Sequence, residues 1–285
     1  MKTYTVTGGG GAQLFVEETG NPNGRPVLFI HGYSQCRLAW NKQLHSDLEK
    51  DLRLVAMDLR GHGLSDKPRD AYIDSQLWAD DIQAVITTLD LKQPILSGWS
   101  YGGVVICDYL AAYGEAQIGG IQLVGAVTRL GEPVMPFLGR EFVNCIPGFF
   151  STNAEESAAA LQTFMRICAY GGPTVADFYF FLGYNTIVPP YVRQGLFSRT
   201  LNYDNLLAKI RKPVQIVHGK EDEIVLHTMS DHIASLIPHA VRSSFSGIGH
   251  ATFWEAPDRF NQELREFVES LPQNKSQLLV ERADR

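Results

Sequence analysis

Gly98-Trp99-Ser100-Tyr101-Gly102 places a serine between two glycines, after a short apolar run at residues 93–97 and before a helical pattern at residues 103–113. A strand, a sharp turn and a helix in this order can hold a serine in an exposed and strained backbone conformation. The glycines are needed because the strand and helix pack so closely that a side chain at either flanking position would clash. The stretch therefore predicts a nucleophilic Ser100 at the end of a buried strand.

Strands and helices alternate on both sides of this turn. Continuous apolar runs, typical of strands buried on both faces, occur at residues 26–30, 52–57, 121–127 and 213–218. Alternating residues at 4–7 and 13–18 predict a hairpin, with a flexible turn in the glycine run 8–11. Apolar residues at helical spacing predict helices over 74–91, capped by Asp74, and over 258–271. The pattern predicts an α/β fold with a mostly parallel sheet and helices on both faces.

The alternation stops between residues 130 and 207, where strand patterns are scarce, Asn153 marks a helix start and aromatic residues are concentrated. We interpret residues 130–207 as a helical cap, or lid, inserted into a core of residues 1–129 and 208–285. Most of its aromatic side chains are expected to pack the cap against the core. Phe137, Phe142 and Phe181 are candidates to line an apolar pocket beneath it. The polar tail from residue 272 is interpreted as a surface extension.

A serine nucleophile needs a base, and the base needs a group that fixes its tautomer. His250 stands out among the eight histidines because it lies in a loop before a helix near the end of the chain, where it can fold back over the sheet. Asp222 follows the predicted strand 213–218 and precedes His250, which gives the order Ser, Asp, His. His31, His62 and His218 each adjoin a glycine near a strand end and are interpreted as loop histidines bonded to the backbone.

The oxyanion of a tetrahedral intermediate needs two backbone N–H donors. One is expected from the residue after the nucleophile, Tyr101, and the other from Tyr33, in the loop that follows the strand 26–30. Trp99 and Val225, beside the serine and the aspartate loop, are further candidates for the pocket wall.

Composition limits the classes of function. The chain has 285 residues, 45% of them hydrophobic and 20% charged, a formal charge of -6 and no apolar run long enough to cross a bilayer. We therefore expect a cytoplasmic protein, a monomer or homodimer, that acts on a small molecule and binds neither nucleic acid nor membrane. Its four cysteines have no metal-ligand spacing and are expected to be reduced and mostly buried. No metal or cofactor is implied.

Five motifs in order carry a resemblance to a known family. They are the turn around Ser100, His31-Gly32 after a strand, the segment 58–68, Asp222 after a strand, and Gly249-His250. Over nearly the whole chain they resemble the α/β-hydrolase superfamily, specifically its capped branch of cofactor-free haloperoxidase-like esterases, epoxide hydrolases and carbon–carbon bond hydrolases. The resemblance implies an eight-stranded sheet with the cap inserted after the sixth strand. It implies a structural turn, without a catalytic role, for the segment 58–68.

Departures from these relatives narrow the expected chemistry. Epoxide hydrolases of this branch carry aspartate where this chain has Ser100, so acyl transfer is favoured and a serine hydrolase of small, largely apolar carboxylic esters is expected. A carbon–carbon bond hydrolase of β-diketone-type substrates is an alternative. Ala251 weakens this alternative, because carbon–carbon bond hydrolases usually carry an aromatic residue after the catalytic histidine. Such an enzyme would also require polar cap groups near the serine, such as Arg193 or Asn185. A small-ligand receptor and a perhydrolase side activity also stay open.

Overall fold

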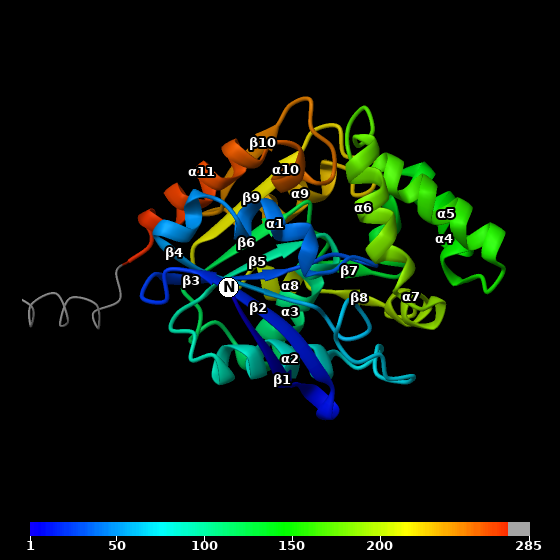
Figure 1. The fold of residues 1–285 in the computed structure, drawn as a ribbon. Coiled ribbons are helices and arrows are strands. Elements are labelled where there is room, and N and C mark those ends of the chain that lie inside the picture. Colours follow the sequence, from blue (N-terminus) through cyan, green and yellow to red (C-terminus); the bar gives the residue numbers. More distant parts are fainter. Residues whose placement is uncertain (273–285) are drawn as a thin grey trace, which may run out of the picture.

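An eight-stranded sheet forms the centre of the protein, whose computed structural model describes residues 1–272 (Figure 1). The strand order is β1-β2-β4-β3-β5-β6-β9-β10. The first two strands pair antiparallel, β2 and β4 also pair antiparallel, and all other neighbours in this sheet are parallel. The strands are β1 (Lys2–Thr7), β2 (Gln13–Gly20), β3 (Arg25–Ile30), β4 (Leu52–Met57), β5 (Ile95–Trp99), β6 (Gly120–Val124), β9 (Val214–Gly219) and β10 (Val241–Phe245).

Helices cover both faces of this sheet, with α2 and α3 on one face and α1 and α11 on the other (Figure 1). Asp74 caps α2 by accepting a hydrogen bond from the Gln76 N–H, as the sequence predicts. The core helices are α1 (Asn41–Leu44), α2 (Ser75–Thr88), α3 (Tyr101–Tyr113), α9 (Thr228–Leu236), α10 (Thr252–Glu255) and α11 (Pro257–Ser270), with 3₁₀ turns η1 (Gly9–Gly11), η2 (Arg37–Trp40) and η3 (Asp47–Lys50).

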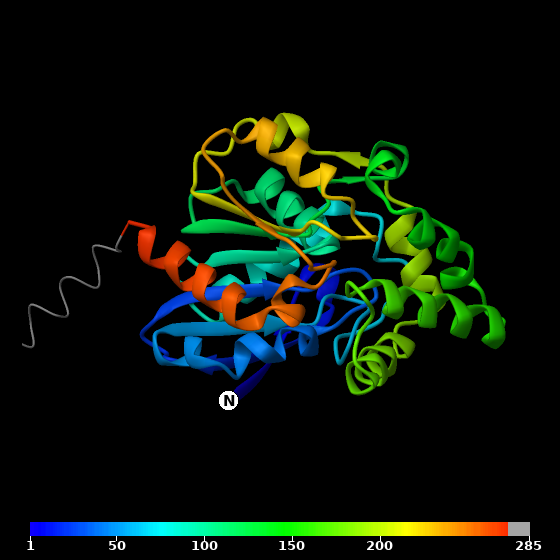
Figure 2. The same ribbon diagram turned by 90° about the horizontal axis from the view of Figure 1, so that it is seen from above.

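A helical insert between β6 and β9 lies beyond one end of the sheet (Figure 2). Asn153 caps its second helix by accepting hydrogen bonds from the N–H groups of Glu155 and Glu156. The insert contains β7 (Arg129–Leu130), η4 (Glu132–Phe137), α4 (Arg140–Phe150), α5 (Ala154–Ile167), α6 (Val175–Thr186), α7 (Pro190–Phe197), β8 (Leu201–Asn202) and α8 (Asp204–Leu207). The eight-stranded sheet and the insert after its sixth strand confirm the predicted fold class.

The structure contains three local features that the sequence did not indicate. The eighth strand, β10, is not indicated by any apolar pattern, because it is a polar edge strand with only Phe245 fully buried. The antiparallel pair β7–β8 within the insert was also not expected. The predicted hairpin is present, because β1 and β2 pair antiparallel across the glycine run. The run itself is a 3₁₀ turn held to the core: the Gly9 N–H donates to Asp81 Oδ1 at 2.9 Å, and its carbonyl accepts from Arg60 Nη2, also at 2.9 Å.

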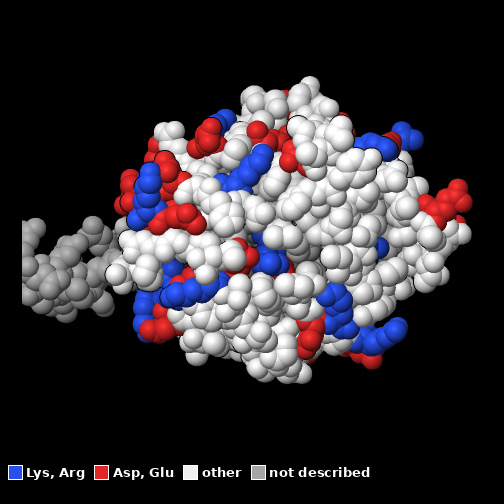
Figure 3. All heavy atoms as spheres, viewed as in Figure 1, with Lys and Arg blue, Asp and Glu red and all other residues white. Residues whose placement is uncertain are grey.

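All four cysteines are buried and free, which confirms the expected thiols. Acidic and basic side chains are intermingled on the face seen in Figure 3. The helices within residues 1–272 are all too short or too polar to cross a membrane. The polar tail from residue 273 onward lies outside the described residues.

Candidate active site

Ser100 occupies the sharp turn between β5 and α3, with φ 54° and ψ −116°. This conformation is strained for any residue with a side chain. A Cβ atom on Gly98 would lie 2.7 Å from the Gly102 carbonyl oxygen, and one on Gly102 would overlap the Ile30 carbonyl oxygen. The two glycines are therefore required by the close packing of β5, α3 and β3, as expected from the sequence.

Asp222 and His250 form a hydrogen-bonded pair in the loops that follow β9 and β10. Nδ1 of His250 donates to Oδ2 of Asp222 at 2.7 Å. The other carboxylate oxygen accepts from the backbone N–H groups of Ile224 at 2.8 Å and Val225 at 2.9 Å. Burial alone would raise the pKa of Asp222, but the imidazoles of His250 and His218 outweigh it and hold this pKa well below its usual value. Because Nδ1 carries the hydrogen, Nε2 of His250 keeps a lone pair that can accept a proton.

The loop after β6 brings Ser100 and this pair together. The Val124 carbonyl accepts from the Ser100 N–H at 2.9 Å. The next residue, Gly125, lies so close to the pair that a Cβ atom there would be 3.2 Å from Nδ1 of His250 and 3.4 Å from Oδ2 of Asp222. Within residues 1–272 the Ser100 hydroxyl and His250 Nε2 form no hydrogen bond, to each other or to another group. Catalytic hydrogen bonds often form only when substrate binds.

Two backbone donors near Ser100 have no partner among the described residues. The N–H groups of Tyr33 and Tyr101 donate no hydrogen bond to any of the described residues. Tyr101 is the first residue of α3, where backbone N–H groups have no partner inside the helix and the helix dipole favours negative charge. The loop that carries Tyr33 approaches the serine closely, since a Cβ atom on Gly32 would lie 3.0 Å from the Ser100 Cβ.

His31 fixes the orientation of this loop. Its Nδ1 donates to the Gly32 carbonyl at 2.8 Å, and its Nε2 accepts from the Leu59 N–H at 3.0 Å. Burial lowers the pKa of His31 to about 4, so the ring is neutral near pH 7. The Gly32 carbonyl and the Tyr33 N–H belong to one planar peptide and point in opposite directions, so this bond also directs the Tyr33 N–H.

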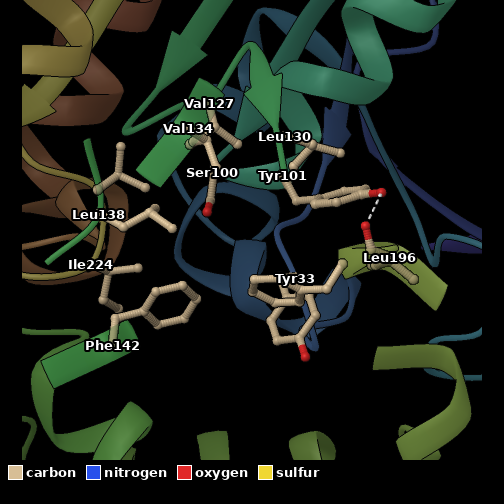
Figure 4. Close-up of a pocket in the computed structure, with 12 residues that line it drawn as sticks. Tyr33, Ser100, Tyr101, Val127, Leu130, Val134, Leu138, Phe142, Leu196 and Ile224 are labelled. Carbon is tan, nitrogen blue, oxygen red and sulfur yellow. Dashed lines mark hydrogen bonds between the residues drawn. The ribbon is translucent and has the colours of Figure 1, made fainter. Parts of the chain in front are cut away.

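Ser100 opens into an apolar pocket between the core and the insert (Figure 4). The pocket encloses about 400 Å³ of empty space, part of it open to solvent. In Figure 4 the Ser100 hydroxyl points into this space, while the Tyr33 hydroxyl points away from it. Its wall consists of Tyr33, Ser100, Tyr101, Val127, Leu130, Val134, Leu138, Phe142, Leu196, Phe197, Ile224 and Val225.

The structure places only some of the predicted pocket residues on this wall. Phe142 and Val225 line the Ser100 pocket. Trp99 and Phe181 line a second, smaller cavity instead, and the Trp99 indole donates to the His250 carbonyl at 3.0 Å. Phe137 lines neither cavity; its ring packs on His232, with ring centroids 5.5 Å apart. These three residues therefore do not line the Ser100 pocket. For Phe137 and Phe181 the reason is that aromatic content does not reveal which side of an element faces a cavity.

His218 is a site residue that the sequence interpretation missed. Its Nε2 donates to the Val225 carbonyl at 2.8 Å, as expected of a loop histidine, and it also contacts Oδ2 of Asp222 at 3.0 Å. The other two histidines of this group bond to backbone as expected, His31 to Gly32 and His62 to the Arg60 carbonyl. The available signal was spacing, because His218 is the penultimate residue of β9 and lies four residues before Asp222.

A buried arginine joins the insert to the loop after Tyr33. Nε of Arg193, on α7, donates to Ser34 Oγ at 3.0 Å, and its Nη2 donates to the Asn185 carbonyl at 2.8 Å. Ser34 is fully buried and has a left-handed φ of 59°. Neither Arg193 nor Asn185 lines the Ser100 pocket. Residues 1–272 contain no group of three or more His, Cys, Asp or Glu side chains arranged to hold a metal ion.

Comparisons with known proteins agree with this architecture. Residues 25–257 match the model of the alpha/beta hydrolase fold family. The crystal structure of the esterase RhEst1 from Rhodococcus sp. ECU1013 superimposes with a TM-score of 0.91, is 38% identical, and is matched over 95% of this chain and 100% of that chain. A bifunctional esterase/perhydrolase from Acinetobacter calcoaceticus is 28% identical over 93% of this chain and 99% of its own length. A non-heme chloroperoxidase from Streptomyces lividans is 27% identical over the same two shares.

Proposed function

The chain belongs to the α/β-hydrolase family, and from this premise we propose that it is a serine esterase that hydrolyses small, largely apolar carboxylic esters. The observation that carries the proposal is the strained Ser100, which faces an apolar pocket beside the Asp222–His250 pair. The similarity to the Rhodococcus esterase supports the same type of reaction.

In the acylation step, Ser100 Oγ attacks the ester carbonyl carbon while His250 Nε2 takes the hydroxyl proton. The carbonyl electron pair moves onto oxygen, where the N–H groups of Tyr33 and Tyr101 stabilise the negative charge. Asp222 accepts a hydrogen bond from the Nδ1–H group and stabilises the imidazolium. When the tetrahedral intermediate collapses, the bond to the alcohol oxygen breaks and His250 returns its proton to the leaving alcohol.

Deacylation repeats these steps with water as the nucleophile. His250 Nε2 takes a proton from water, the hydroxide oxygen bonds to the acyl carbon, and the same two N–H groups bind the oxyanion. The bond to Ser100 Oγ then breaks, and Oγ recovers a proton from His250. The net reaction consumes one ester and one water and yields a carboxylic acid and an alcohol.

The apolar pocket wall supports an apolar substrate group, which we take to be the acyl group. Apart from the Ser100 hydroxyl, it is formed by aliphatic and aromatic side chains, so a charged or strongly polar acyl group would lose hydration without gaining a partner. Carbon–carbon bond hydrolysis is not favoured, because Arg193 and Asn185 lie away from this wall. We expect a short or compact apolar acyl group, with activity decreasing as the chain outgrows the pocket.

The test compares hydrolysis of p-nitrophenyl acetate, butyrate and longer esters by the wild type and Ser100→Ala. We expect activity on the short esters and a loss of at least about 1,000-fold in kcat in the variant, because the triad works as a unit. Ser157→Ala, which changes a half-buried serine on α5, is the matched control and should retain activity. Undiminished turnover in Ser100→Ala would exclude Ser100 as the nucleophile.

A further inference from the structure

The feature not used by this mechanism is the second imidazole on Asp222. His218, on β9, has a side chain that is 1% exposed, and its Nε2 lies 3.0 Å from Asp222 Oδ2 and 2.8 Å from the Val225 carbonyl oxygen. Both neighbours are hydrogen-bond acceptors, so Nε2 must carry the hydrogen and share it between them. Nδ1 of the same ring is buried and has no partner. A hydrogen on Nδ1 would be a buried N–H without an acceptor, which is unfavourable.

The hydrogen bonds of Asp222 show what this arrangement changes. Oδ1 accepts from two backbone N–H groups, which hold the carboxylate in its loop. Oδ2 accepts from both His250 and His218. The oxygen that stabilises a protonated His250 is therefore shared with a second donor, which withdraws negative charge from it.

Packing alone does not account for His218. An imidazole with one unpaired buried nitrogen is less favourable at such a position than an apolar side chain of similar size. What the ring gains there is its contact with Asp222 and with the Val225 carbonyl, the residue that also lines the Ser100 pocket.

We propose that His218 is a positioning residue of the catalytic triad, which holds Oδ2 of Asp222 in place and limits how strongly this carboxylate stabilises the protonated His250. The proposal rests on the triad of the proposed function. Its consequence is that the acid limb of the pH–activity profile depends on the residue at position 218.

Other titratable groups among residues 1–272 also lie near His218 and Asp222. Cys168 and Glu255 face Asp222 from the insert and from α10. The Glu255 carboxylate accepts hydrogen bonds from the backbone of Gly249, Ala251 and Tyr170. The ring of His227 lies 5.4 Å from the ring of His218, centroid to centroid, and has Asp231 and Arg242 as its own charged neighbours. These groups are unchanged in the variants below, so a difference between variants reports on position 218.

The experiment compares His218→Leu, which removes the donor, with His218→Gln, whose amide nitrogen can replace Nε2. In the pH profile of kcat/KM for p-nitrophenyl butyrate, the acid limb of His218→Leu should move to higher pH by about 0.5 to 1 unit, whereas His218→Gln should stay close to the wild type. His62→Leu is the matched control, because His62 is also buried, bonded to a backbone carbonyl and left with one unpaired nitrogen. Its acid limb should coincide with that of the wild type.

A second readout does not depend on turnover. The His250 Nδ1 hydrogen bonded to Asp222 should give a downfield proton resonance, and its titration in the same variants follows the same equilibrium. The role of His218 would be overturned if folded His218→Leu showed the wild-type acid limb and the wild-type titration of this resonance. Equal shifts of the acid limb in His218→Leu, His218→Gln and His62→Leu would also overturn it. Absence of Ser100-dependent esterase activity would overturn the proposed function instead, while the resonance would still test the coupling of His218 to His250.

Discussion

At the scale of single residues, the site contains stored backbone strain. Ser100 has φ 54° and ψ −116°, a conformation that glycine adopts without the steric penalty of a Cβ atom. We expect Ser100→Gly to be more stable than Ser100→Ala by about 1 kcal/mol, because glycine relieves the strain but loses some of this gain through its greater freedom in the unfolded chain. Urea unfolding of the two inactive variants measures the difference. Equal stabilities, or a more stable alanine variant, would show that the turn is not strained.

Among the helices, a buried ion pair between Arg199 and Asp108 links the end of the insert to α3. Arg199 follows α7 and donates to Asp108 on α3 at 2.7 Å, and both side chains are almost fully buried. Another nitrogen of this guanidinium donates to the Tyr101 hydroxyl at 3.0 Å. Arg199→Met should lower the free energy of unfolding by about 3–5 kcal/mol, because it leaves the Asp108 carboxylate buried without its partner.

The double variant Asp108→Leu with Arg199→Met distinguishes two causes of the stability loss in Arg199→Met: an unpaired buried carboxylate and the loss of side-chain packing. Because it buries no unpaired charge, it should be more stable than Arg199→Met alone, as measured by urea unfolding. A double variant that is as unstable as the sum of its single changes would contradict this explanation.

The elements also show what could be predicted from the sequence. Strands buried on both faces and helices with a clear cap, such as α2 after Asp74, have local patterns that identify them. The strand β10 does not, because it pairs only with β9 at the edge of the sheet and is largely polar. Ser100, Asp222 and His250 could be proposed because each directly follows a strand or precedes a helix, so chain order indicates where they meet.

The pocket wall and the role of His218 required the folded chain. Phe137 and Phe181 satisfy the same composition argument as Phe142, yet only Phe142 faces Ser100, because each helix or turn is oriented by partners distant in sequence. His218 has the sequence context of His31 and His62, and only the path of the loop after β9 brings it against Asp222.

At the scale of the whole molecule, the insert and the core are joined beside the proposed oxyanion donors. Arg193 bonds to the Ser34 hydroxyl and to the carbonyl groups of Asn185 and Phe149, so one guanidinium connects α4, α6 and α7 with the loop after Tyr33. Among residues 1–272 no carboxylate pairs with it. The insert therefore does more than cover the pocket. Through Arg193 it also contacts Ser34, which has a left-handed backbone and directly follows Tyr33 in the chain.

Arg193→Met should therefore lower kcat on p-nitrophenyl butyrate by about 10- to 100-fold, since small displacements of a catalytic donor are costly, while KM changes little. Steady-state kinetics on folded protein measures both constants. Arg166→Met, which changes an exposed arginine on α5, is the control and should leave both unchanged. A rise in KM at constant kcat would mean that Arg193 holds only the pocket wall. A fall in kcat at constant KM means that the insert helps to place the donor that stabilises the transition state.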